Sequence, residues 1–176
     1  MVPDCGRITL PRNYTVGYLK QHLKFTESTL LDEACLGLKA DEKDQVWKAE
    51  KILSGLGFTE DEFYKSPAVF SGGFQVRLNL AKVLLAEPHL LLLDEPFIGQ
   101  DRANVAWVIA KILAARAKGA VILLVSHDIP LVNSLCDRLL YLGAESIIGD
   151  PRTVSARLQM MGKDTFNPGY WEGETT

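Results

Sequence analysis

The chain has 176 residues, of which 47% are hydrophobic and 23% are charged, a composition that suits one globular domain with a core of its own. Its net charge of −3 gives no basic field along the sequence, so any contact with nucleic acid would need a local basic patch or a missing segment. The sequence does not argue for RNA binding, and we expect no DNA binding. Three scattered cysteines without a C-x-x-C pair, Cys5, Cys35 and Cys136, favour reduced thiols over a disulfide framework or a zinc site. No apolar stretch reaches the ~20 residues of a membrane span and no signal peptide is recognised, so we expect a cytoplasmic protein without direct membrane insertion.

The first third of the chain predicts strands followed by packing helices. The expected elements are strands over residues 7–10 and 14–21 and helices within residues 26–38 and 41–56. The second strand ends at Gln21, and Asp41 is the expected cap of the second helix. We expect the two helices to pack by their apolar faces, with Trp47 in the core.

Residues 70–101 carry the densest set of functional signals in the chain. Ser71 and two glycines open an amphipathic helix with uncovered backbone amides, and such amides suit the binding of a phosphate. The leucine run 90–93 is too short to span a membrane and predicts a strand buried on both faces of a parallel sheet. Asp94 and Glu95 follow at the carboxyl end of this strand, the edge where open α/β sheets bind ligands, so the pair suits a magnesium nucleotide.

The last third predicts a second strand of the same sheet and a small group of C-terminal elements. The apolar run 120–125 predicts another buried parallel strand, which delivers His127 to the same sheet edge as Glu95. The further expected elements are a helix over 129–136, a hairpin of strands 137–142 and 146–148, and a helix over 154–161. Residues 162–176 lack apolar periodicity, and we expect them to form a loose tail.

One expected motif of nucleotide-binding proteins is missing from the 176 residues. No G-x-x-x-x-G-K-[ST] sequence occurs, although this loop supplies the amides and the lysine that hold the β- and γ-phosphates. Gly162-Lys163-Asp164 is no substitute, because it lacks the earlier glycine, the hydroxyl and a preceding strand.

Five segments, in order along the chain, nevertheless carry a family resemblance. Gln21 resembles a Q-loop residue, Ser71-Gly72-Gly73-Phe74-Gln75 a signature loop, Leu91-Leu92-Leu93-Asp94-Glu95-Pro96 a Walker B strand, Asp101 a D-loop aspartate, and Ser126-His127-Asp128 a switch histidine. On these motifs and their spacing the chain is identified as a member of the ATP-binding cassette (ABC) ATPases. The resemblance implies an α/β fold: a P-loop-NTPase-like parallel sheet core with an inserted helical subdomain, here without the N-terminal part of the cassette.

The resemblance also implies a role for each motif residue. Asp94 is expected to hold Mg²⁺, Glu95 to orient and polarise the attacking water, and His127 to contact the γ-phosphate of ATP. Gln21 is expected to touch both the metal and the water. The residues expected to meet ATP held by a second, head-to-tail cassette are Ser71, Gly72, Gly73, Gln75 and Asp101.

The expected partial cassette covers residues 1–161, with the helical insertion over about residues 22–85 and the tail at residues 162–176. Family resemblance implies ATP hydrolysis in a paired cassette. Because the phosphate loop is missing, we expect this chain to be inactive by itself.

The sequence points to two subfamilies and leaves three functions open. Residues 74–81 resemble the F subfamily, the soluble twin-cassette proteins that act on ribosomes, whereas residues 97–101 resemble import ATPases of the energy-coupling type. The first function is an ATPase that powers a transporter and contacts a membrane transport subunit, through which it could sit at the inner face of a membrane. The second is a translation factor that acts on the ribosome, and the third is a truncated, non-catalytic cassette.

Overall fold

The computed structural model describes residues 6–19, 24–143 and 145–161. The chain divides into two compact units, Met1–Val125 and Ser126–Thr176, which are described separately. Gln21 and the predicted tail at residues 162–176 lie outside the described residues. In the described part of the chain, no helix is long and apolar enough to cross a membrane.

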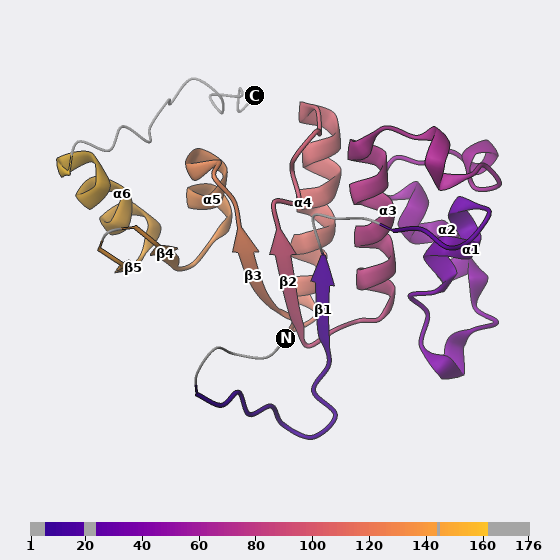
Figure 1. Ribbon diagram of the computed structural model, residues 1–176, viewed down its shortest axis with the longest axis horizontal. Coiled ribbons are helices and arrows are strands. Elements are labelled where there is room, and N and C mark those ends of the chain that lie inside the picture. Colours follow the sequence, from indigo (N-terminus) through magenta and orange to yellow (C-terminus); the bar gives the residue numbers. More distant parts are fainter. Residues whose placement is uncertain (1–5, 20–23, 144, 162–176) are drawn as a thin grey trace. The chain divides into compact units, whose positions relative to one another are not determined.

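The first unit is built on a sheet of three parallel strands, which confirms the predicted parallel core (Figure 1). The strands are β1 (Val16–Leu19), β2 (Leu90–Asp94) and β3 (Val121–Val125), in the spatial order β1-β2-β3. In the register of the sheet, Leu90 lies between Val16 and Val121. All three strands therefore end at one edge, and β2 carries Asp94 to that edge.

Two long helices cover one face of this sheet. They are α3 (Gly72–Leu85), which packs on β1, and α4 (Arg102–Ala117), which packs near β3. The chain crosses the sheet in the same direction twice, from β1 to β2 and from β2 to β3. Because crossovers between parallel strands are right-handed, both helices lie on the same face. On this face Leu91 and Leu93 are fully buried, and each contributes about 1.5–3 kcal/mol of hydrophobic stabilisation.

On the opposite face of the sheet, no described helix or strand of the first unit covers the side chains. Its apolar side chains come from all three strands in register and are called here the bare sheet face: Val16, Tyr18, Leu90, Leu92, Val121, Leu123 and Val125. Val121, Leu123 and Val125 are 57%, 56% and 53% exposed. The expectation that residues 120–125 form a strand buried on both faces is therefore wrong for the described chain.

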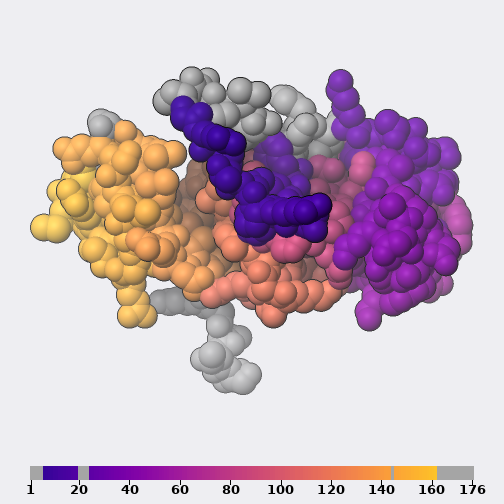
Figure 2. Space-filling model, turned by 90° about the horizontal axis from the view of Figure 1, so that it is seen from below, coloured from indigo at the N-terminus to yellow at the C-terminus, as the bar shows by residue number. Residues whose placement is uncertain are grey.

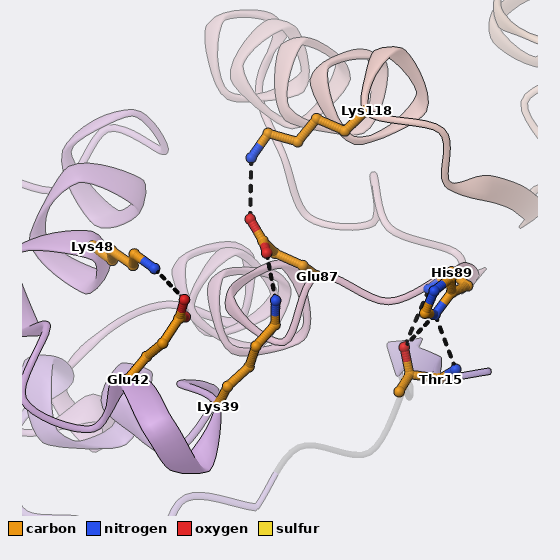
Figure 3. A network of polar contacts seen from close by, with 7 residues as sticks. All are labelled: Thr15, Lys39, Glu42, Lys48, Glu87, His89 and Lys118. Atoms are coloured by element: carbon orange, nitrogen blue, oxygen red, sulfur yellow. Dashed lines mark hydrogen bonds and ion pairs between the residues drawn. The ribbon is translucent and has the colours of Figure 1, made fainter. Parts of the chain in front are cut away.

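The described residues before β1 do not extend over this face. Figure 1 shows residues 6–15 beyond the amino end of β1, and Figure 2, seen from below, shows the same indigo residues on the near side of the molecule. These residues form no strand, so the predicted strand over residues 7–10 is wrong. Within this segment Thr15 is held by His89, whose Nδ1 lies 3.1 Å from the backbone nitrogen of Thr15 and 2.9 Å from its hydroxyl (Figure 3).

A helical subdomain lies between β1 and the end of α3, as the sequence predicts. It contains α1 (Leu30–Cys35), α2 (Val46–Ser54) and three single 3₁₀ turns, Ala40–Glu42, Glu60–Glu62 and Pro67–Val69. Both α1 and α2 pack on α3, with Ala34, Ala49 and Leu53 fully buried. Two details differ from expectation: Asp41 lies inside a 3₁₀ turn rather than capping α2, and Trp47 is 56% exposed rather than in the core.

Glu33 is a fully buried charge in this subdomain. Its carboxylate accepts hydrogen bonds from the backbone N–H of Thr26 at 2.8 Å and of Glu27 at 2.9 Å, and it pairs with Lys82 of α3. Burial is the largest effect and raises the pKa of Glu33, but Lys82 and the two N–H groups outweigh it, so the pKa is lowered overall.

Ion pairs at the surface tie the subdomain to α4 (Figure 3). Lys39 and Lys118 reach Glu87 from opposite sides, with N···O distances of 2.6 Å and 3.3 Å. The hydrogen bond from Lys39 is the main reason that the pKa of Glu87 is lowered. All three side chains are well exposed, so this network adds little to the free energy of unfolding.

The second unit contains the predicted helix, hairpin and final helix. These are α5 (Ile129–Leu135), β4 (Leu139–Tyr141), β5 (Ile147–Gly149) and α6 (Pro151–Met160). The two strands pair antiparallel, and α6 packs on both of them. Asp128 and Asp150 cap the two helices, each accepting the backbone N–H of the residue three positions further on.

We predict that Glu33→Ala lowers the free energy of unfolding by about 2–4 kcal/mol, because it leaves Lys82 and two backbone N–H groups without their buried acceptor. Glu42→Ala is the matched control: it removes the pair between Glu42 and Lys48, a 2.6 Å contact nearer the surface, and should cost under about 1 kcal/mol. Urea unfolding of the three proteins measures both effects.

The difference in free energy of unfolding between the parent and Glu33→Ala should also depend on pH. Because the pKa of folded Glu33 lies below its ordinary value of 4.5, its contribution is complete above that value and disappears as the pH falls through the lowered pKa. A Glu33→Ala protein as stable as the parent at neutral pH would contradict the assignment.

Candidate functional site

Two acidic residues occupy the carboxyl edge of the sheet in the first unit. Asp94 is the last residue of β2 and pairs in register with Val125, and Glu95 follows directly. The backbone N–H of Glu95 donates to the carbonyl of Val125 at 2.9 Å. Glu95 has a φ of 49°, a left-handed conformation that is strained for a residue with a side chain. Such strain at a ligand-binding edge is typical of functional positions.

Asp94 faces the open side of the sheet. Side chains alternate along a strand, so Asp94 lies on the same face as Leu92, whereas Leu93 is buried against the helices. Asp94 and Glu95 are both half-buried, which leaves them accessible at the edge. The described residues contain no group of three or more potential ligands that could hold a metal ion. One carboxylate together with substrate phosphates nevertheless fits Mg²⁺, which seldom uses an all-protein cage.

The glycine-rich start of α3 is partly open and partly packed. Ser71 occupies the N-cap position of α3, but its side chain makes no capping hydrogen bond. Gly72, the first helical residue, is exposed, and a Cβ built on it would have nothing within 4 Å. This helix end therefore presents N–H groups and the positive end of the helix dipole, a combination that suits an anion.

Gly73 joins this helix start to the segment that follows Glu95. A Cβ built on Gly73 would lie 2.4 Å from the carbonyl oxygen of Gly99, so only glycine allows the two backbones to approach this closely. Gln100 strengthens the contact by donating from its side-chain nitrogen to the carbonyl of Gly73 at 2.7 Å. The two motifs that the sequence singled out separately are thus packed against each other.

The other predicted residues of this site have partners inside the fold. Asp101 caps α4, accepting the backbone N–H of Asn104 at 2.9 Å and its side-chain amide at 3.0 Å. The side chain of Gln75 donates to the carbonyls of Phe70 at 3.1 Å and Pro67 at 3.3 Å, which anchors the segment before α3. Both contacts position the helix starts.

His127 belongs to the second unit, in the turn between β3 and α5, and is exposed. In this turn the backbone N–H of Asp128 donates to the hydroxyl of Ser126 at 3.2 Å. Gln21, the remaining predicted residue, lies outside the described residues.

The sequence analysis did not single out Arg77, a buried residue of α3. Arg77 is fully buried, donates to the carbonyl of Leu56 at 2.5 Å, and lies 3.9 Å above the ring of Phe74 and 5.5 Å from that of Trp107 on α4. Its Nε and second terminal nitrogen have no hydrogen-bond partner among the described residues, and burial lowers its pKa. The spacing of Phe74 and Arg77 on one helix face was the available signal.

A parallel sheet with an acid pair at its carboxyl edge, packed beside a glycine-rich helix start, defines an α/β protein of the nucleotide-binding class. A sequence model of the ABC transporter family matches residues 5–98. The chain therefore belongs to the ABC transporter family, and its core is an ABC ATPase cassette.

Relatives of two kinds are similar to the chain. ABC transporter F family member 4 of Arabidopsis thaliana is 39% identical over 57% of this chain and 13% of the relative. Energy-coupling factor transporter ATP-binding protein EcfA3 of Oenococcus oeni is 32% identical over 79% of this chain and 51% of the relative. The chain thus spans about half the length of these relatives or less. Both subfamilies predicted from the sequence are represented.

Solved structures agree with the fold. The dimeric structure of a post-hydrolysis state of an ATP-binding cassette bound to ADP and Pi superposes with a TM-score of 0.65 at 21% identity. The match covers 77% of this chain and 63% of that one.

We predict that Gly73→Ala lowers the free energy of unfolding by about 1–3 kcal/mol, because its Cβ forces the backbone of Gly99 away. It should also speed amide hydrogen exchange in residues 98–101. Gly72→Ala is the matched control at the adjacent open position and should be neutral or slightly stabilising. Equal stability and equal exchange in both variants would show that the Gly73–Gly99 approach does not constrain the site.

Proposed function

We propose that this cassette binds Mg-ATP and hydrolyses it within a head-to-tail pair of cassettes. We further propose that the conformational work of this pair powers a transporter. One observation carries the proposal: the start of α3, where Gly72 is exposed, packs against residues 99–100, which follow Glu95 in the chain. One side of the molecule thereby offers a site for a water and a metal, and the neighbouring helix end offers amides for the phosphates of a second cassette.

The chemistry assigned to the acid pair is phosphoryl transfer to water. Mg²⁺, when bound, would neutralise charge on the phosphates, and Asp94 would hold it. Glu95 would accept a hydrogen bond from the attacking water and hold it in line with the γ-phosphorus. The new P–O bond forms as the bond to the bridging oxygen breaks, the proton of the water passes to Glu95 and then to phosphate, and ADP leaves.

The open position of Gly72 supports the paired arrangement. An exposed, uncapped helix start with free space over its first residue can receive an anion only from outside the unit. A dimer is also the form of the structural neighbour that holds ADP and Pi. We therefore assign Ser71, Gly72 and Gly73 to the phosphates of the second cassette, Asp101 to the interface, and His127 and Gln21 to the nucleotide held by this cassette.

A transporter is favoured over a ribosome factor by one surface. The extent of similarity does not separate the two, because the energy-coupling relative matches 79% of the chain and an F-family relative of Encephalitozoon cuniculi matches 77%. The helical subdomain exposes Leu36, Val46 and Trp47, at 46%, 36% and 56%, where a transport subunit could bind. The F-family similarity keeps a translation factor as the second candidate, which cosedimentation with ribosomes would reveal.

We predict that Glu95→Gln keeps ATP binding but lowers steady-state hydrolysis by ~100-fold or more, in a protein that joins this chain to a segment carrying a phosphate loop. The amide keeps the shape of the side chain and removes its pull on the water. Glu60→Gln, at an exposed position on the helical subdomain, is the matched control and should leave the rate unchanged. Turnover of Glu95→Gln within about threefold of the parent would refute the role.

A further inference from the structure

Gln100 joins the start of α3 to the segment between Glu95 and α4. Its side-chain nitrogen donates to the backbone carbonyl of Gly73 at 2.7 Å, although the two residues are 27 positions apart in the sequence. Gly73 is the second residue of α3, so the bond reaches the first turn of this helix. The helix end that the proposed function assigns to the phosphates of a second cassette is therefore held by Gln100.

Backbone turns fix where Gln100 lies relative to the acid pair and to α4. The backbone N–H of Ile98 donates to the carbonyl of Glu95 at 3.3 Å, which closes a turn directly after the acid. Gly99 follows with a φ of 67°, a left-handed conformation that favours glycine. Asp101 then caps α4 through the backbone N–H of the third residue beyond it. Gln100 thus projects from a segment that is anchored at both ends.

Stability does not explain why this position holds a glutamine. The side-chain oxygen of Gln100 is buried and has no hydrogen-bond partner among the residues that the structure describes. The free energy lost on burying an unpaired acceptor matches or exceeds the gain from a typical hydrogen bond, so the bond to Gly73 and the unpaired oxygen offset each other. A leucine would fill a similar volume without a polar atom. What the glutamine adds is a donor directed at Gly73.

From these observations we infer that Gln100 is a positioning residue of the shared nucleotide site. Its amide holds the exposed start of α3 at a fixed place relative to Glu95 and Asp101. Gln100 acts through Gly73 and does not itself contact the nucleotide. The inference rests on the proposed function, because it names a residue that sets the geometry of the same site.

Gln100→Leu in the full 176-residue chain separates positioning from stability. The urea midpoint of unfolding should equal or exceed that of the parent, because the unpaired buried oxygen is removed. The amide hydrogens of Gln75, Ile98 and Val105 should nevertheless exchange at least about threefold faster, since the helix start and the segment after Glu95 are no longer joined. Gln159→Leu, an exposed position on α6 of the second unit, is the matched control and should change neither quantity.

Gln100→Glu gives a readout that a packing role would not produce. The new side chain has the same shape but can donate to the carbonyl of Gly73 only when its carboxyl is protonated. Burial beside a carbonyl should raise the pKa of this carboxyl. The deficit in stability against the parent should then be small near the ordinary glutamate pKa of about 4.3 and grow as the pH rises through the raised pKa. The excess exchange rate at Ile98 should follow the same pH profile.

Hydrolysis is measured in the protein that joins this chain to a segment carrying a phosphate loop. There Gln100→Leu should lower steady-state hydrolysis by ~10-fold without weakening the binding of Mg-ATP, because the helix start is misplaced and the acid pair is not. Gln159→Leu should hydrolyse ATP as the parent does.

Parental exchange rates in Gln100→Leu would overturn the inference, as would a deficit of Gln100→Glu that is the same at about pH 5 and about pH 8. Parental hydrolysis by Gln100→Leu would also overturn it. The two proposals fail separately. A joined parent protein that binds Mg-ATP but does not hydrolyse it refutes the proposed function, whereas the exchange rates and the pH profile of the 176-residue chain decide by themselves whether Gln100 positions the helix start.

Discussion

The position of β2 between two parallel strands is the constraint on which the first unit depends. Its backbone pairs with β1 and β3 along its whole length, and Leu91 and Leu93 anchor the covered face with no exposed surface or nearly none. A strand held on both edges cannot shift by one residue without moving both leucines into water. The same register fixes Asp94 at the carboxyl edge and allows the N–H of Glu95 to reach the carbonyl of Val125.

The rest of the site is attached to this edge by one close backbone approach and one side-chain hydrogen bond. The close approach of Gly73 and Gly99 brings the start of α3 against the segment that leaves β2, and Gln100 holds the two together. Arg77, which is buried on α3, contacts the half-exposed ring of Trp107 on α4 in a cation–π contact. The start of α3 and the segment that follows Glu95 therefore form one packed unit.

Local patterns were enough to predict what lies close together in the sequence. The leucine run predicted β2, the glycines after Ser71 predicted the start of α3, and the segment around Gly143 predicted the β4–β5 hairpin. Hydropathy did not predict burial correctly where burial depends on which other segments cover a residue. Residues 121–125 have the composition of a buried strand, yet one face is open, because composition reports what the sequence is suited to bury and not what covers it. The prediction that Trp47 lies in the core was wrong for the same reason. The roles of Gln100 and Arg77 depend on contacts between residues far apart in the sequence, which hydrophobic periodicity does not predict.

We propose that this chain holds one part of a nucleotide site: the two acids and the exposed helix start, without a glycine-rich loop that would hold the phosphates. Two carboxylates facing a triphosphate repel it unless cations screen them, and none of the fixed amides and lysine of a phosphate loop is present in the sequence. Calorimetric titration of the purified 176-residue chain with Mg-ATP tests this most directly. We expect binding no tighter than about millimolar, an affinity of roughly −4 kcal/mol, with no measurable hydrolysis. Micromolar binding of Mg-ATP by the chain alone would contradict the account.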